Sequence, residues 1–425
     1  MNTTLWKCLP LEKCIAKIID FRGKTPKKIG MEWGGGNIKA LSANNVKQGY
    51  IDFDKECYVG SQALYDAWMT KGDCSKGDIV FTMEAPLGNV ALIPDDDKYI
   101  LSQRVILLKP NDLVDSNYLY HYISSEKFQN ELLINATGST AKGIKQSRLI
   151  KINIILPPKK WQINISNILT NIDKKIDLID KKIALTQKLK CGLIQRLFSE
   201  GVGVQDDKYI WKSHDKFKKS SVGIIPNSWR TCPLSDLVTI KSKKYDPKIS
   251  SEKYACIELE HISQGTGKIL GSANSSELSS IKNHFNKESV LFGKLRPYLK
   301  KFAFPNYDGV CSTEIWVLNV IDRETIDPLF IFYLIQHDRF MNEANKSCGT
   351  KMPRADWKVV SGLEVPVPPL FEQIKIASIL NTVDKKLSLL EEQKSETQLL
   401  KKGLMQKLLT GEWQVPLDCD EEEAA

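Results

Sequence analysis

The sequence lacks the features that mark several large classes of protein. None of its ten cysteines stands in a C-x2-C pair and its five histidines are dispersed, so the usual spacing of a zinc site is missing. The N-terminus has no basic segment followed by an apolar run of about 7 to 15 residues. No stretch reaches the roughly 18 to 20 apolar residues of a membrane-spanning helix. We therefore expect reduced thiols, no metal centre, no membrane association and a cytoplasmic location.

Motifs for nucleotide and cofactor chemistry are also missing. The triplet Gly23-Lys24-Thr25 lacks the first glycine of a phosphate-binding loop, because Ile18 stands in its place. The run 34–36 is Gly-Gly-Gly and does not fit G-x-G-x-x-G. The two Pro-Pro pairs lack the Asn/Asp and aromatic neighbours expected of an amino-methylating DNA enzyme. Since no nucleophile, base and orienting group assemble, we expect a chain that is not an enzyme.

Size and charge point to a large folded protein with a polyanionic partner. The chain has 425 residues, of which 42% are hydrophobic, enough for two to four units with buried cores. The net charge is +9, and since residues 412–425 contribute six acidic and no basic side chains, the rest carries +15. Such a surplus favours nucleic acid, but it is too widely spread to identify the partner by itself.

One segment of the chain occurs twice. Residues 157–199 align without a gap with residues 368–410, at an offset of 211, and 19 of the 43 positions are identical. Both copies begin at Pro-Pro and carry apolar residues at alternating steps of three and four, which predicts a helix with one apolar seam. A helix of about 38 residues is about 57 Å long, too long to be buried in one compact domain. We predict that the copies pack on each other as an antiparallel coiled coil; the alternative is an ordinary amphipathic helix on each globule.

The repeat continues weakly into the segments that precede each helix. At the same offset Gly77–Gly88 corresponds to Glu288–Leu299 and Ala136–Gln146 to Ser347–Trp357, whereas the matching N-terminal ends are offset by 223. Short apolar runs bounded by turn residues predict strands there, and residues 117–133 and 328–344 predict helices. The two globules therefore share a framework and differ in their loops.

The predicted fold class is α+β, with two mixed α/β globules separated by two long antiparallel helices and related by an internal pseudo-two-fold repeat. The predicted order is a first globule over residues 1–156, a helix over 157–199, a surface linker over 200–228, a second globule over 229–367, a helix over 368–411 and an acidic tail over 412–425.

In this combination the chain resembles the specificity subunits of type I restriction-modification systems, the HsdS family. The resemblance rests on two dissimilar globules, on the repeated helices with Gln162 and Gln373 near their start, and on the Gly-Leu-x-Gln-[Arg/Lys]-Leu endings at Gly192 and Gly403. It implies a non-catalytic subunit whose target recognition domains each read one half of a bipartite sequence in double-stranded DNA. Its helices would set the spacing and dock the modification (methyltransferase) subunits.

The resemblance also implies which cofactors belong to the complex. Restriction (translocase and nuclease) subunits would join it, and the partner chains, not this one, would bind S-adenosylmethionine, ATP and magnesium. The target is expected to be non-palindromic, with half-sites about 34 Å apart and the helix length as an upper limit. A coiled-coil scaffold that binds proteins and has no DNA specificity is the alternative. A second alternative is a fused enzyme that methylates or cuts DNA alone, and the missing cofactor motifs count against it.

Candidate DNA contacts lie where basic residues alternate with aromatic or polar ones. In the second globule, Arg296 suits a bidentate contact to guanine and Lys300 and Lys301 suit phosphates. The candidates there are Lys294, Arg296, Tyr298, Lys300, Lys301, Lys351 and Arg354. The candidates in the first globule are Ser42, Asn44, Asn45, Lys142, Lys145 and Gln146. For each of them, ordinary polarity of a solvated loop is the alternative.

Overall fold

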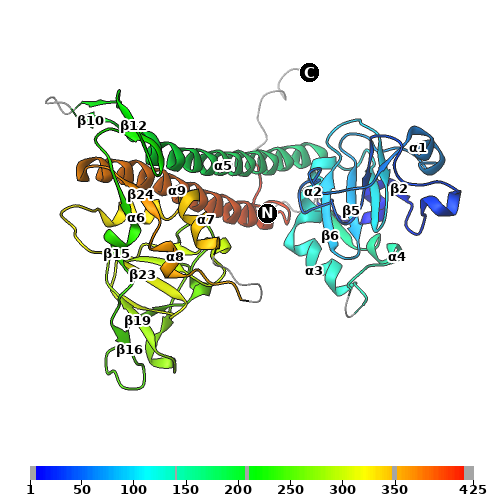
Figure 1. Cartoon of the computed structure of the whole chain (residues 1–425). Coiled ribbons are helices and arrows are strands. Elements are labelled where there is room, and N and C mark those ends of the chain that lie inside the picture. The colour runs from blue at the N-terminus through cyan, green and yellow to red at the C-terminus, as the bar shows by residue number, and fades with distance from the viewer. Residues whose placement is uncertain (1–5, 139–140, 206–209, 347–351, 416–425) are drawn as a thin grey trace, which may run out of the picture. The chain divides into compact units, whose positions relative to one another are not determined.

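The computed structural model describes residues 6–138, 141–205, 210–346 and 352–415, which form two compact units (Figure 1). Unit 1 comprises residues 1–180 and 392–425, and unit 2 comprises residues 181–391. The boundary falls inside both long helices. Each helix therefore contributes one part to each unit. The predicted order treated each helix as a single segment and did not include this division.

Unit 1 is built on a four-stranded antiparallel sheet next to a smaller three-stranded one. The larger sheet has the order β2 (Ile15–Asp20), β8 (Val105–Pro110), β5 (Ile79–Met83), β6 (Leu87–Leu92). The smaller has the order β4 (Val59–Gly60), β3 (Ile38–Leu41), β7 (Tyr99–Leu101), with β3 and β7 parallel. Its helices include α1 (Gln62–Trp68), α2 (Ser116–Ser124), α3 (Glu126–Ile134) and the short α4 (Gln146–Leu149). The strand β1 (Lys7–Pro10) pairs with β9 (Asn153–Leu156), so both ends of the first globule meet.

The central strand β5 separates two cores in unit 1. Its side chains alternate between the two faces of the sheet, as a strand requires. Ile79 and Phe81 belong to the core that contains residues of α2, whereas Val80 belongs to the core that contains Leu64 and Trp68 of α1. Because both faces are covered, the strand begins with three consecutive apolar residues, 79–81, and all five of its residues are buried.

Unit 2 repeats this plan with a larger second sheet. One sheet has the order β15 (Val238–Thr239), β23 (Ile315–Val320), β20 (Val290–Gly293), β21 (Phe302–Ala303). The other has the order β16 (Lys244–Tyr245), β19 (Lys282–Phe285), β22 (Gly309–Cys311), β17 (Ala255–Ile257), β18 (Ala273–Asn274), with β17 and β22 parallel. The strand β14 (Arg230–Pro233) pairs with β24 (Glu364–Val367) in the register that β1 and β9 show. The helices of this globule are α6 (Pro328–Leu334), α7 (Asp338–Lys346) and the short α8 (Trp357–Val360).

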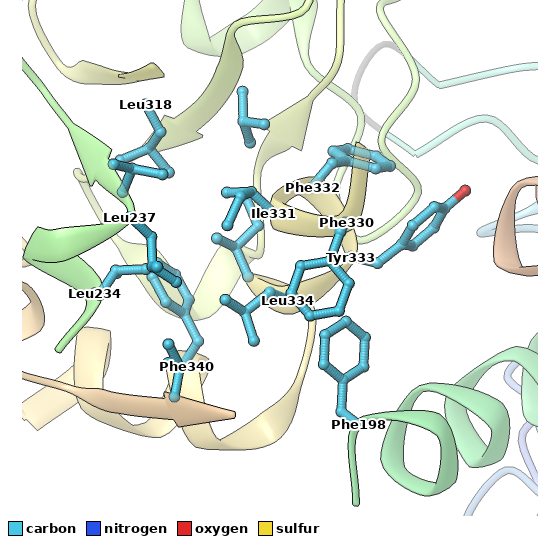
Figure 2. Close-up of a cluster of buried hydrophobic side chains, with 14 of the residues drawn as sticks. Phe198, Leu234, Leu237, Leu318, Phe330, Ile331, Phe332, Tyr333, Leu334 and Phe340 are labelled. Atoms are coloured by element: carbon cyan, nitrogen blue, oxygen red, sulfur yellow. The ribbon is translucent and has the colours of Figure 1, made fainter. Parts of the chain in front are cut away.

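The main core of unit 2 joins the globule to the long helices (Figure 2). Phe330 of α6 and Phe340 of α7 lie in this core with Leu318 of β23. Phe198, near the end of the first long helix, packs on Phe330 with ring centroids 5.0 Å apart. Burying several phenylalanines stabilises this junction, since each contributes about 2 to 3 kcal/mol through its apolar area.

Both predicted helices of the globules are interrupted in the structure. The segment 117–133 breaks at Ser125, whose hydroxyl accepts a hydrogen bond from Phe128 N and so caps the start of α3. The segment 328–344 likewise divides into α6 and α7. Periodicity alone predicts one helix here, because it does not show whether a serine lies within a helix or caps the start of a new one.

The two repeated segments are long helices, α5 (Lys159–Glu200) and α9 (Leu370–Leu408). In unit 1, Asp173 and Asp180 of α5 pair with Lys401 and Lys394 of α9, so the two helices run antiparallel. The coiled-coil prediction is confirmed. No helix among the described residues combines the length and the apolar character needed to cross a bilayer.

The predicted surface linker over 200–228 is more ordered than expected where the structure describes it. It contains β10 (Val204–Gln205) paired with β11 (Trp211–Lys212), and β12 (Phe217–Ser220) paired with β13 (Gly223–Pro226).

A single carboxylate of α9 anchors the linker at both of its ends. Glu372 is fully buried, and one of its oxygens accepts hydrogen bonds from Val202 N (2.9 Å) and Gly203 N (3.1 Å) and contacts His214 Nε2 (2.9 Å). Its other oxygen accepts from Trp229 Nε1 at 2.8 Å. Composition could not reveal this anchor, because the carboxylate stands about 170 residues further along the chain.

Candidate nucleic-acid interface

In each unit four loops meet at one edge of the globule, which we call the four-loop edge. In unit 2 its loops are 257–265, 293–301, 312–314 and 352–355. In unit 1 they are 41–49, 83–88, 102–104 and the described parts of 137–145. The first three loops of each edge follow the ends of strands and the fourth follows a helix, α7 in unit 2 and α3 in unit 1, so segments distant in sequence meet there.

Backbone hydrogen bonds tie the loops of unit 2 to one another. The amide of Ser312 donates to the carbonyl of Ile257 at 3.0 Å. Lys294 is the centre, because its amide donates to Glu314 O at 2.9 Å and its carbonyl accepts from Ala355 N at 2.9 Å. Main-chain bonds through Lys294 thus tie three of the loops together.

Unit 1 has the same bonds at the corresponding positions. Ser102 N donates to Leu41 O at 2.7 Å, Met83 N donates to Arg104 O at 2.8 Å, and Met83 O accepts from Ile144 N at 3.0 Å. The isolated bridge between Glu84 and Gly143 in unit 1 corresponds, at an offset of 211, to that between Leu295 and Arg354 in unit 2. The weak sequence match outside the helices therefore marks a shared backbone.

Backbone conformation supports the same correspondence. Ala85 and Arg296 both have positive φ, 41° and 51°, and both precede a proline. Residues other than glycine rarely adopt this left-handed conformation. Its recurrence at an offset of 211 shows that the turn belongs to the common framework.

The structure brings most of the predicted contact residues to the four-loop edges. In unit 2 the edge contains Lys294, Arg296, Tyr298, Lys300, Lys301 and Arg354. In unit 1 it contains Ser42, Asn44, Asn45, Lys142 and Lys145, with Gln146 directly adjacent as the first residue of α4. Lys351 lies outside the described residues.

Exposure separates the unit 2 candidates. Arg296, Lys300 and Tyr298 are exposed, and 52% of the Tyr298 surface is accessible. Lys294 is half-buried. Lys301 differs from the prediction, because its Nζ donates to the carbonyl of Leu259 at 2.6 Å and so links two loops instead of offering its charge to a phosphate.

Asn45 also differs from its predicted role as a base reader. Its side chain is fully buried, Oδ1 accepts from Ser42 N at 2.8 Å and Nδ2 donates to Ala40 O at 3.1 Å. It closes the loop after β3. In unit 2, His261 holds the equivalent loop, since its Nδ1 accepts from Glu258 N at 3.0 Å.

The other unit 1 candidates remain accessible. Asn44, Lys142 and Lys145 are exposed, while Ser42 and Gln146 are half-buried. The hydroxyl of Ser42 accepts a hydrogen bond from Asn44 N at 3.2 Å and donates one to Asn45 Oδ1 at 3.4 Å, so it takes part in closing this loop.

Sequence reasoning missed the acidic partners at both edges. Arg354 forms two hydrogen bonds with Glu314, and these bonds raise the pKa of the guanidinium. In unit 1, Arg104 pairs with Glu84 at 3.2 Å. Arg104 and Glu314 occupy equivalent positions, because the carbonyl of each accepts a hydrogen bond from the second loop of its edge. A full alignment of the two globules would therefore have shown that a basic residue in unit 1 is replaced by an acidic one in unit 2.

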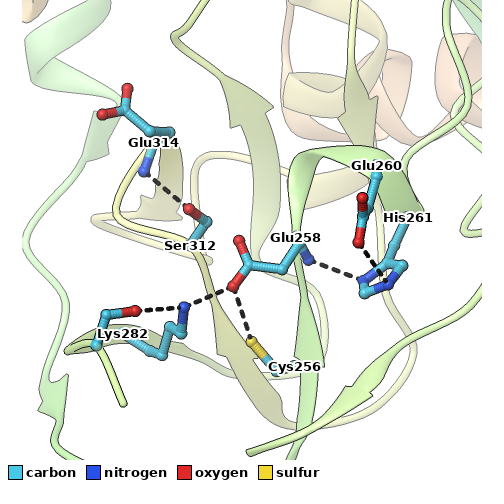
Figure 3. Close-up of polar contacts among 8 residues, drawn as sticks. Cys256, Glu258, Glu260, His261, Lys282, Ser312 and Glu314 are labelled. Carbon is cyan, nitrogen blue, oxygen red and sulfur yellow. Dashed lines mark hydrogen bonds and ion pairs between the residues drawn. The ribbon is translucent and has the colours of Figure 1, made fainter. Parts of the chain in front are cut away.

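A second polar group lies beside the first loop of the unit 2 edge (Figure 3). The buried Lys282 of β19 lies 2.5 Å from Glu258 and also donates to Ser280 Oγ at 2.9 Å. The Cys256 thiol contacts the same oxygen of Glu258 at 3.8 Å, and burial, aided by that carboxylate, raises its pKa to about 12. The thiol stays protonated at neutral pH, so this group is structural.

Polar clusters also stand where the helices meet the globules. In unit 2, Asp384 of α9 contacts Lys190 of α5 at 2.7 Å and accepts a hydrogen bond from the Tyr333 hydroxyl at 2.9 Å. A cleft of about 600 Å³ opens beside them.

The corresponding cluster in unit 1 has a histidine in place of the tyrosine. Lys401 lies 2.5 Å from Asp173, and His121 Nδ1 lies 3.9 Å from the same carboxylate. Burial, with Lys401 nearby, lowers the pKa of His121 to about 3, so its ring is neutral. A cleft of about 770 Å³ lies beside this cluster. Among the described residues, no three His, Cys, Asp or Glu side chains gather as metal ligands.

Comparison with known proteins identifies the repeated framework. The sequence profile described as "Type I restriction modification DNA specificity domain" matches residues 12–187 and 226–399. The two matches include both four-loop edges and most of both long helices.

Two archaeal relatives and one solved structure extend over most of the chain. The type I restriction enzyme MjaVIII specificity subunit of Methanocaldococcus jannaschii is 29% identical over 75% of each chain. The putative MjaX specificity subunit of the same organism is 26% identical over 87% of this chain and 86% of its own. The crystal structure of a type I restriction-modification S subunit from M. genitalium shares the fold, with a TM-score of 0.57 and 18% identity over 96% of this chain and 97% of that one.

Proposed function

Because the chain belongs to the family of type I restriction modification DNA specificity domains, we propose that it is the non-catalytic subunit that selects the DNA sequence in a type I restriction-modification complex. The observation that carries this proposal is the four-loop edge, which both units build with the same main-chain bonds and different side chains. A common backbone with different side chains suits two readers of unlike sequences. The target would be bipartite and non-palindromic.

Each edge would combine phosphate and base contacts. Lys300 and, in place of the guanine contact expected from the sequence, Arg296 are exposed on the unit 2 edge and would meet phosphates, which supply most of the affinity for DNA. Lys142 and Lys145 would do the same on the unit 1 edge. Half-buried polar residues such as Ser42 would face base edges, where hydrogen-bond patterns distinguish base pairs.

The helices would dock the modification subunits. Six leucines of α5 and α9 are at least half exposed despite the coiled coil, namely Leu178, Leu185, Leu189, Leu389, Leu399 and Leu400. Exposed apolar side chains on solvated helices suit contact with another protein. The modification subunits would bring S-adenosylmethionine chemistry, and restriction subunits would bring ATP-driven translocation and magnesium-dependent cleavage.

Helix length would set the spacing of the two half-sites. The helix α5 is continuous over 42 residues, which corresponds to about 63 Å. An insertion of seven residues would keep the heptad seam and lengthen the helix by about 10 Å.

The proposal is tested with the full chain in its own host. The chain is purified under native conditions and its companions are identified by mass spectrometry, while methylated DNA motifs are mapped with and without the gene. We expect a methyltransferase to co-purify and one bipartite motif to lose its methylation when the gene is deleted. An unchanged methylation pattern, together with no methyltransferase, contradicts the proposal and favours a scaffold.

Salt dependence of duplex binding tests the edge itself. The slope of log K against log salt is about −0.9 for each phosphate contacted, so the double substitution of Arg296 and Lys300 by alanine should reduce it by about 2. The matched control removes two exposed lysines of α5, Lys181 and Lys182, at equal cost in charge. An equal change in both double variants would mean that general charge, not this edge, attracts the DNA.

A further inference from the structure

We propose that Arg354 reads a guanine in the half of the target assigned to unit 2, and that Glu314 is a positioning residue that holds its guanidinium for this contact. The inference rests on the proposed function and deepens it, because it names one base and the two side chains that select it.

The ion pair between these residues has a defined geometry. Glu314 Oε2 accepts from Arg354 Nε at 2.9 Å, and Oε1 accepts from Nη2 at 3.2 Å. The carboxylate therefore occupies the side of the guanidinium. Among the described residues no acceptor bonds to Nη1, so the end formed by Nη1 and Nη2 points away from the carboxylate.

Guanine matches the end of the guanidinium that faces away from Glu314, formed by Nη1 and Nη2. Its N7 and O6 are two adjacent acceptors in the major groove, and no other base presents two acceptors there. A guanidinium offers a planar fork of donors that meets both. A lysine in this place would be a single charge without that geometry.

Both partners are fixed before any ligand arrives. The backbone of Arg354 forms a bridge with Leu295, and the residue that follows donates to Lys294 O at 2.9 Å. Glu314 is held by its own carbonyl, which accepts from Lys294 N at 2.9 Å. Since the two side chains extend from one hydrogen-bonded framework, less conformational freedom is lost on binding.

Stability of the fold does not explain the pair. The side chains of Arg354 and Glu314 are 43% and 29% exposed, and ion pairs this accessible contribute about 0 to 1 kcal/mol. The pair is also neutral as a whole, so it adds nothing to the general attraction for phosphates. Arg296 and Lys300 on the same edge supply that attraction.

Unit 1 carries the opposite charge at the position of Glu314 and pairs it with a different loop. Position 314 corresponds to Arg104, which pairs with Glu84 of the second loop. In unit 2 the acid is on the third loop and the cation on the fourth. The two edges therefore present different groups at this place, as readers of unlike sequences should.

The same globule supplies a matched control. Arg323 pairs with Glu288 at 2.7 Å, and both residues are exposed. They lie at the opposite end of the paired strands β20 and β23 from the four-loop edge. Arg323→Gln removes the same kind of interaction without touching the proposed reader.

The experiment maps methylated motifs in the host after the gene is replaced by each variant. Arg354→Gln should lower the preference for guanine at one position of one half-site by about tenfold or more and leave the other positions unchanged. Arg354→Lys should lose the same preference while still supporting methylation. Glu314→Gln should weaken selection at that same position, by a smaller factor, whereas Arg323→Gln should change nothing.

Three results would overturn the inference. One is a guanine preference that survives Arg354→Gln at every position. Another is an effect of Glu314→Gln that is equal at all positions, which indicates a merely structural role. The third is a motif independent of the gene, which would also end the proposed function; in the first two cases that function stands. Thermal unfolding of each purified variant separates loss of recognition from loss of folding.

Discussion

Lys190 of α5 lies 2.7 Å from Asp384 of α9. The residues at the equivalent positions of the other copy, Lys401 for Lys190 and Asp173 for Asp384, form a second pair 2.5 Å apart. One interaction belongs to unit 2 and the other to unit 1. The aspartates come from the identical Asp-Lys-Lys triplets of the two copies. The repeat therefore pairs with itself in a reciprocal manner, which fixes the register of the seam at two places.

Asp384→Asn should lower the free energy of unfolding of unit 2 by about 2 to 3 kcal/mol. Lys190 is buried, and it would lose the charge that compensates for its removal from water. Urea unfolding followed by circular dichroism measures the effect, and exchanging the residues as K190D/D384K should recover most of it. Arg196→Ala, which breaks the exposed pair with Glu200 on the same helix, should cost about 0.5 kcal/mol or less. Equal losses in both variants would show that burial does not strengthen the first pair.

The stability of unit 1 should fall as the pH drops below about 6.5. Burial lowers the pKa of His121 to about 3, so the unfolded chain binds a proton between these two values and the folded chain does not. The stabilisation from neutral His121 is complete above pH 6.5 and decreases by about 1.4 kcal/mol for each pH unit below it.

Comparing the wild type with His121→Gln isolates this contribution. The pKa of the neighbouring Asp173 is raised by burial, which opposes the effect as the pH falls, so the comparison is made at pH 5.5 and pH 7.5. Urea unfolding at both values should show a difference that shrinks at pH 5.5. A difference independent of pH would mean that His121 is protonated in the folded chain.

Gln373→Leu should cost about 2 to 3 kcal/mol. The side chain is fully buried, its Oε1 accepts from Asp327 N at 3.0 Å, and its Nε2 donates to Thr325 O and Pro368 O at 2.9 Å each. Leucine preserves much of the volume but leaves buried main-chain groups without partners. Chemical unfolding checks this, with Gln398→Leu on an exposed part of the same helix as the control. The first copy makes the same three kinds of bond through Gln162, so Gln162→Leu should behave alike in unit 1.

Glu372→Ala should release the linker. Four donors lose a buried acceptor, so local opening of residues 200–228 becomes easier and trypsin should cut between Lys212 and Lys219 at least about tenfold faster. Limited proteolysis with mass spectrometry locates the cuts. Glu392→Ala, an exposed acid of the same helix, serves as the control and should leave the cutting rate unchanged. Glu372→Gln retains one acceptor oxygen and should fall between the two.

The sequence predicted the parts of the fold that depend on periodicity. A gapless repeat with an apolar seam identifies the long helices, because the seam of each copy needs a partner and the other copy provides it. The Gln162 and Gln373 positions were found in the same way. The anchor at Glu372 could not be found, since its donors are supplied by distant segments that only the folded chain brings near.

The candidate site shows the same division. The basic and polar clusters of the sequence lie on the loops that form the edges, but neighbouring residues within one loop differ in burial. Asn44 is exposed and Asn45 is fully buried, and composition does not distinguish them. Glu314 and Arg354 are 40 residues apart, and only the main-chain bonds through Lys294 bring them together.

The main-chain bonds between the loops have a consequence for how such a protein can change. Lys294 and Met83 hold their neighbouring loops through amide and carbonyl groups, which every residue except proline carries. Side chains that make no contact between or within the loops can then be exchanged one at a time while the loops keep their shape, whereas Asn45, His261 and Lys301 hold loops through their side chains. A new preference at one base pair therefore needs no new fold, and one half of the target can be altered while the other half is left as it was.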